Sequence, residues 1–188
     1  MKVYDDEVFS GVCFAKDGLD GLEYDGCRFE SCDFSGVSFR GIEFLDCRFV
    51  GCDFSLVKLD GTGLKNASFT GCKLMGVDFS VASSFLFAVS FTDCLLDYSI
   101  FIKKSMKGTT FRNSSVKSAI FEACDLTKAS FDGCCLANTS FLQNNLQQAD
   151  FRTATEYSFD LEMNRAKGAK FAYLGVLGLL SKYGIEVE

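Results

Sequence analysis

The chain has 188 residues and a formal net charge of −6 at pH 7, with 21 Phe and 10 Cys but no His, Pro or Trp. Its length is typical of one domain with a core of its own. The absence of His excludes a Ser-His-Asp triad, a Cys-His pair and any His-bearing metal site. The acidic balance argues against a groove for nucleic acid, because such grooves depend on Lys and Arg.

The N-terminal sequence MKVYDDEVF lacks a basic segment followed by an apolar run, which a secretory signal would require. The longest apolar stretch, around residues 172–180, is too short to span a bilayer. We therefore expect a soluble cytoplasmic protein with neither membrane nor nucleic acid as a direct partner. In a reducing compartment its Cys residues are expected to be small buried residues or ligands, not disulfides.

A five-residue period begins at Tyr4 and continues to Phe79, with a bulky apolar residue at each of sixteen centres. This period fits neither the 3.6-residue turn of a helix nor the two-residue alternation of a strand, so each unit must turn a corner. A small side chain recurs two residues before each centre. Gly recurs two residues after it, where a tight corner uses a residue without Cβ.

The units CDFSG, CRFVG, ASFTG, CDLTK and ASFDG resemble the A(D/N)LXX repeats of the pentapeptide-repeat family. The resemblance implies an all-β fold, a right-handed quadrilateral β-helix over residues 1–171, in which four units make one square coil. Residues twenty apart would then stack at about 4.8 Å. One face would collect a continuous Phe ladder at positions 9, 29, 49, 69, 91, 111, 131 and 151.

The first three coils contain the acidic excess, because residues 1–60 hold 13 acidic and 6 basic side chains, a net charge of −7. On the face centred on Tyr4, Tyr24 and Phe44 these acidic residues form a candidate surface that mimics DNA phosphates or contacts a basic partner. Ordinary solvation of a solenoid face is the alternative. Lys104, Lys107 and Lys128 are expected on the same face farther along the chain. The acidic candidates are Asp5, Asp6, Glu23, Asp25, Glu43 and Asp46.

Eight of the ten Cys occupy the small position before a centre, and several share one face of the square. A thiolate ladder for metal or redox chemistry is one interpretation. We favour the other, that buried Cys here is a small apolar residue, and we expect no metal and no cofactor. Cys13 and Cys135 occupy outward positions and are the candidate reactive thiols.

The register slips at residues 81–87, where seven residues separate the centres Phe79 and Leu86. The slip predicts a bulge or kink in the solenoid. From Leu86 the five-residue period resumes through fourteen further centres and ends at Phe151.

After Phe151 the pattern weakens, because Glu156 falls on a central position before Leu161, Ala166 and Phe171 restore the register. Residues 172–188 are predicted to form a short helix and tail, stopped at Gly184, that cap the last coil. The segment has more apolar surface than a cap needs, so we also predict a dimer interface. Its residues are Leu174, Val176, Leu177, Leu179 and Leu180.

The ending, with NRAKGAKF and LLSKYGIEVE, resembles the C-terminal module of the bacterial pentapeptide-repeat branch of quinolone-resistance proteins and the microcin B17 immunity protein. That resemblance implies a homodimer that binds DNA gyrase or topoisomerase IV by DNA mimicry and protects it from poisons. The chain lacks the two long projecting loops of the quinolone-resistance type and is more similar to the loopless members. We therefore expect a binding protein that is not an enzyme. The alternative is a structural or scaffolding repeat protein with another protein partner.

Overall fold

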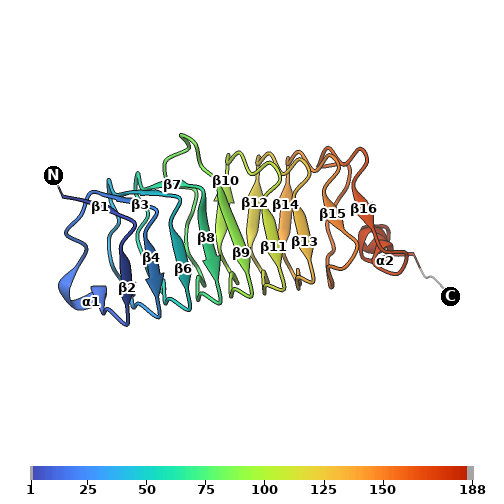
Figure 1. Cartoon of the computed structure of the whole chain (residues 1–188). Helices are drawn as coiled ribbons and strands as arrows, with labels where there is room; N and C mark the ends of the chain where they lie inside the picture. The colour runs from blue at the N-terminus through green and yellow to red at the C-terminus, as the bar shows by residue number, and fades with distance from the viewer. Residues whose placement is uncertain (1, 186–188) are drawn as a thin grey trace.

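A computed structural model describes residues 2–185 of the chain as a rod of stacked coils (Figure 1). The first coil and the C-terminal helix lie at opposite ends of the rod. Strands about twenty residues apart pair in parallel, so that Phe9 lies beside Phe29 and Phe29 beside Phe49. The quadrilateral β-helix that the repeat predicts is confirmed.

Three parallel sheets follow the sides of the rod, and isolated bridges such as Asp33 to Asp53 hold the remaining sides. The first sheet contains β1 (Val3–Asp5), β3 (Glu23–Asp25), β5 (Glu43–Leu45) and β7 (Gly63–Lys65). The second contains β10 (Ile100–Ile102), β12 (Ile120–Glu122) and β14 (Ser140–Leu142). The third contains β2 (Val8–Ser10), β4 (Arg28–Glu30), β6 (Arg48–Val50), β8 (Ala67–Thr70), β9 (Val89–Thr92), β11 (Thr110–Arg112), β13 (Ser130–Asp132), β15 (Asp150–Phe151) and β16 (Lys170–Phe171).

The predicted Phe ladder fills the interior along the third sheet. Neighbouring rings of the ladder are stacked, with centroids 4.8–5.3 Å apart from Phe9 to Phe151. Offset aromatic pairs contribute about 0.5–1.5 kcal/mol each beyond the area that they bury. The predicted small inner positions are also confirmed, because all eight Cys of the repeat are buried.

A short helix in the first coil, α1 (Phe14–Asp17), is absent from the sequence prediction. Phe14 stays in the core with 7% exposure, so the helix changes the corner and not the interior.

The slip at residues 81–87 forms a segment that projects beyond the neighbouring coils, drawn in green in Figure 1. The prediction that Leu86 is the first centre of the second register is wrong. Leu86 is 64% exposed and has a positive φ of 55°, whereas Phe87 is 6% exposed and packs in the core. The corner is therefore one residue longer than the spacing from Phe79 to Leu86 suggests, and the interior position falls on Phe87.

The last coil also departs from the predicted register. Glu156 and Leu161 are exposed, and Tyr157 and Phe159 fill the interior in their place, at 3% and 9% exposure. The ring of Phe159 lies 4.8 Å from that of Phe141 in a tilted arrangement. Tyr157 lies one position after Glu156, and Phe159 lies two positions before Leu161. These two aromatic residues thus fill the interior space that the five-residue spacing assigns to Glu156 and Leu161.

The C-terminal helix α2 (Val176–Leu180) packs on this last coil, and a 3-10 turn, Ser181–Tyr183, follows it. Leu179 is buried at 5% exposure, and Gly184 ends the turn in the left-handed region, as predicted. A Cβ on Gly178 would overlap the carbonyl oxygen of Tyr157, so close docking of α2 requires glycine there. Among the described residues, no helix is long and apolar enough to cross a membrane.

Candidate functional site

The predicted acidic residues come together on the outer side of β1, β3 and β5. The parallel register places Asp5 beside Asp25 and Glu23 beside Glu43. Asp6 and Asp46 lie at the adjoining corner, both with positive φ near 50°. The structure therefore gathers all six predicted carboxylates into three short rows, which we call the acidic surface.

Few cations neutralise the acidic surface. Lys65 Nζ lies 2.8 Å from Glu43 Oε2, and the Glu43 carboxylate covers Gly63, where any side chain would overlap it. Asn66 Nδ2 donates to Asp46 Oδ1 at 2.6 Å. Within residues 2–185, Asp5, Asp6, Glu23, Asp25 and Asp46 make no ion pair.

Like charges directly opposite each other destabilise a sheet. Two unit charges about 4.8 Å apart repel each other by about 1 kcal/mol even at the dielectric constant of water. Asp5 and Asp25 form such a pair. Glu23 and Glu43 are also register partners, but Lys65 neutralises Glu43. The acidic surface thus costs stability, which favours a role in binding over a role in folding.

Two further acidic residues border this surface and were not among the predicted set. Glu7 is exposed beside Asp6, although its place in the repeat assigns it to the neighbouring side. The sequence signal that could have placed Glu7 at this border is the run of three acidic residues from position 5 to position 7. Asp20 lies at the other border of the acidic surface. Its carboxylate accepts a hydrogen bond from Lys2 Nζ at 2.5 Å and one from Tyr4 Oη at 2.7 Å.

Lys104 was predicted on the outside of the same face, and this prediction is wrong. Its side chain is directed inward and is 2% exposed. Lys104 Nζ donates to the Ala82 carbonyl oxygen at 2.5 Å and to Ser84 Oγ at 3.1 Å, and lies 5.2 Å from the centre of the Phe87 ring. Lys104 therefore fills the space that the slip segment leaves.

Several inner Cys residues are buried thiols with a raised pKa. Burial raises the pKa of Cys47 to about 12 and that of Cys134 to about 11, so these thiols stay protonated. Their sulfurs donate to backbone carbonyls of the preceding coil, as Cys134 Sγ does to Phe111 at 3.3 Å. In the described part of the chain, no three His, Cys, Asp or Glu side chains converge as metal ligands.

The two outward thiols are half-buried, and each donates a hydrogen bond to a carboxylate. Cys13 Sγ donates to Asp33 Oδ2 at 3.5 Å, and Cys135 Sγ donates to Glu156 Oε1 at 3.4 Å. Thiolate reactivity depends on cationic or helix N-terminal surroundings. The reactivity of Cys13 and Cys135 stays a prediction.

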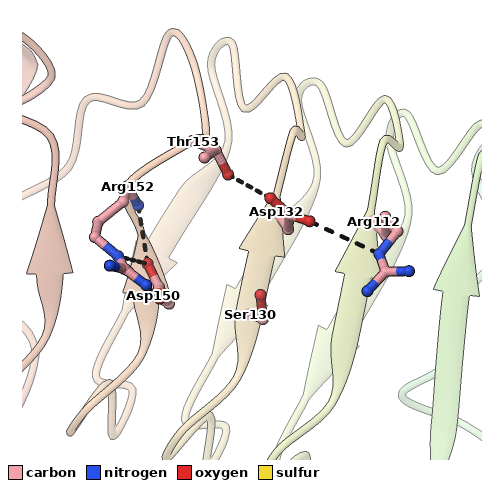
Figure 2. A pocket seen from close by; sticks show the side chains of 6 residues that line it. All are labelled: Arg112, Ser130, Asp132, Asp150, Arg152 and Thr153. Carbon is pink, nitrogen blue, oxygen red and sulfur yellow. Dashed lines mark hydrogen bonds and ion pairs between the residues drawn. The ribbon is translucent and has the colours of Figure 1, made fainter.

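A shallow hollow of about 460 Å³ lies outside β11, β13 and β15 (Figure 2). Arg152 forms a two-point contact with Asp150, with Nη2 2.7 Å from Oδ2 and Nε 3.0 Å from Oδ1. Arg112 Nε lies 3.7 Å from Asp132, which also accepts from Thr153 Oγ1 at 2.7 Å. Because its charges are paired with each other, we assign this hollow no ligand and no reaction.

The predicted dimer residues separate into two groups. Leu174, Val176 and Leu177 are 74%, 38% and 45% exposed, while Leu180 is half-buried. Leu179 is buried against the last coil, so it belongs to the cap and is not available to a second chain. Tyr173, 92% exposed, extends the exposed apolar area.

Two family models match this sequence. The model described as a pentapeptide repeat region matches residues 23–101, and the model described as pentapeptide repeats (8 copies) matches residues 124–155, so that the two together cover more than half of the chain. The chain therefore belongs to the pentapeptide-repeat family. A search of curated proteins returned no match.

Solved structures of the same fold are similar along most of the chain. HetL, a pentapeptide repeat protein involved in heterocyst differentiation regulation from the cyanobacterium Nostoc sp. strain PCC 7120, is 17% identical, with a TM-score of 0.57 over 89% of this chain and 84% of its own. A trypsin-treated variant of QnrB1, a plasmid-mediated fluoroquinolone resistance protein, is 18% identical, with a TM-score of 0.45 over 100% of both chains. At this identity the likeness to HetL supports the fold and leaves the partner open.

Proposed function

We propose that this chain is a cytoplasmic, non-enzymatic binding protein whose acidic surface contacts the DNA-binding surface of a type II topoisomerase, DNA gyrase or topoisomerase IV. The observation that carries the proposal is the set of carboxylate rows on β1, β3 and β5, in which Glu43 alone of the six residues is ion-paired within the described part of the chain. The C-terminal sequence resemblance indicates the class of partner. A protein surface of one sign attracts a partner surface of the opposite sign and orients it.

The charge density of the acidic surface supports DNA mimicry. Five carboxylates without an ion pair among residues 2–185, spread over three coils or about 14 Å of the rod, give one charge per about 2.9 Å. Duplex DNA carries one charge per about 1.7 Å of its axis. The acidic surface therefore presents roughly three-fifths of the charge density that a topoisomerase meets on its DNA substrate.

The test is a supercoiling assay with purified gyrase, with and without a quinolone, together with calorimetric titration against the same enzyme. We expect the protein to alter supercoiling at micromolar concentration. Asp25→Lys, Glu43→Lys and Asp46→Lys in combination are expected to weaken binding at least tenfold. Each removed contact is charged, so binding by the unaltered protein should fall as salt rises.

The matched control carries Asp60→Lys, Asp93→Lys and Glu156→Lys, which change the net charge equally at exposed positions outside the acidic surface. This control is expected to retain binding. No effect on supercoiling together with no rescue from a quinolone would reject the proposal. A pull-down that recovers no topoisomerase would instead favour a scaffolding protein with another partner.

A further inference from the structure

An apolar patch lies on the outside of the second sheet, where two neighbouring strands carry isoleucine outward. Ile100 and Ile102 flank the buried Phe101 on β10, so both are directed outward. The neighbouring third sheet has Thr110 and Arg112 at the equivalent positions of β11. The residues of this isoleucine patch are Tyr98, Ile100, Ile102, Ile120 and Leu142.

The strand register brings the isoleucines of the patch together. Ile100 is the direct partner of Ile120 on β12. Glu122 lies between Ile102 and Leu142 in the other row. Neighbouring strands are about 4.8 Å apart, so Ile100 and Ile120 are close enough to pack against each other, whereas Glu122 separates Ile102 from Leu142. Ile120 is 38% exposed, and Tyr98 is 60% exposed at the adjoining corner.

Tyr98 occupies an unfavourable backbone conformation without burying its ring. Its φ is +63°, at a corner where the coils before and after have Gly76 and Ser118. The left-handed conformation costs a residue with a Cβ roughly 1–2 kcal/mol. The same conformation recurs at Leu56 and Asn138 on this corner, so it belongs to the repeat, and Tyr98 differs only in adding an exposed ring to the patch.

The charges around the isoleucine patch indicate the chemistry of its partner. Asp78 is the bridge partner of Ile100, and Glu122 is the strand partner of Ile102. Neither carboxylate forms an ion pair within the part of the chain that the structure describes. Lys103 follows Ile102 directly, and the carbonyl oxygen of Lys117 accepts from Tyr98 N at 2.8 Å, so both lysines adjoin the patch at its corners, while the two carboxylates lie within the strand rows. An apolar centre with unpaired carboxylates on the same face is complementary to an apolar segment flanked by Lys or Arg.

We propose that the isoleucine patch docks a segment of a partner protein in which apolar side chains are flanked by basic residues. The surface is separate from the acidic surface, which lies on β1, β3 and β5 of another sheet. The rod thus has a second contact for a protein partner, and this inference does not depend on the topoisomerase proposal.

The test is selection of a random peptide library displayed on phage against the intact protein. We expect enriched peptides to contain aliphatic or aromatic residues flanked by Lys or Arg. Synthetic copies should bind the variant Ile100→Thr, Ile102→Thr, Ile120→Thr at least tenfold more weakly. Thr retains β propensity, and circular dichroism shows that the solenoid is intact.

The matched control is Val3→Thr with Val8→Thr, which removes exposed aliphatic groups from β1 and β2 and should leave peptide affinity unchanged. A second variant, Asp78→Lys with Glu122→Lys, keeps the apolar side chains and should also weaken the basic peptides at least tenfold. Enrichment of acidic peptides, or equal affinity for wild type and both patch variants, would overturn the proposal. Self-association that only the Thr variant abolishes would show that the occupant is a second copy and would also overturn it.

Discussion

Lys104 occupies an interior position that the repeat otherwise gives to small side chains such as Cys124, one coil farther on. Its ammonium group reaches the Ala82 carbonyl and Ser84 under the slip segment. A buried charge without a carboxylate partner costs stability, but here it supplies a donor where the insertion interrupts the repeat. Lys104 thus fixes the path of the segment at a cost in stability.

This cost predicts a pH dependence. Burial lowers the pKa of Lys104 below its ordinary value of 10.5, and the nearby Cys124 and Asp78 oppose that shift. Between the lowered pKa and 10.5 the unfolded chain binds more protons than the folded chain, so stability rises with pH through this interval. We expect wild type to gain stability relative to Lys104→Met between pH 7.5 and pH 10.5. Urea unfolding at the two pH values measures this, at about 1.4 kcal/mol per unit of lowered pKa.

Comparison with Lys104→Met cancels the other groups that titrate in this range, because they are present in both proteins. Lys103→Met changes the exposed neighbour and should keep the wild-type pH dependence. A difference between wild type and Lys104→Met that stays constant with pH would show that the buried amine does not titrate between the two conditions.

The elements that could be predicted from the sequence are those in which the five-residue period is unbroken. The Phe ladder, the buried Cys positions and the acidic rows follow from stacking every twenty residues. The errors lie where the spacing changes: Leu86 was chosen over Phe87, and Leu161 over Phe159. Spacing cannot tell how an insertion divides between a corner and a strand, because that depends on which side chain best fills the interior.

Helix α2 illustrates the same limit, because its cap contact depends on glycine backbones that no period marks. Gly178→Ala would place a Cβ against the carbonyl oxygen of Tyr157, a backbone atom that cannot rotate away. Ala favours helix by about 1 kcal/mol, so without this contact the substitution would stabilise α2. We expect the opposite sign. Amide hydrogen exchange in residues 176–180 should be at least tenfold faster, with exchange in β11 unchanged, and slower exchange would contradict the packing described.

The two ends of the rod differ in character. The acidic surface belongs to the first three coils, and the exposed apolar surface belongs to α2 at the far end. An isologous contact through α2 would produce a longer rod with an acidic surface toward each end. Such a dimer would keep the two acidic surfaces much farther apart than the Debye length of about 8 Å at physiological salt, so they would not repel each other.

We therefore predict that Leu174 and Leu177 contact a second copy of the chain. Leu174→Lys with Leu177→Lys should convert a species of twice the 20.7 kDa chain mass into a monomer, measured by size-exclusion chromatography with light scattering. Both side chains are exposed in the single chain, so the substitutions remove an interface without opening the core. Val3→Lys with Val8→Lys introduces the same charges at the opposite end and should leave the dimer intact. A monomeric wild type, or a double Leu variant that remains dimeric, would show that α2 serves only as the cap.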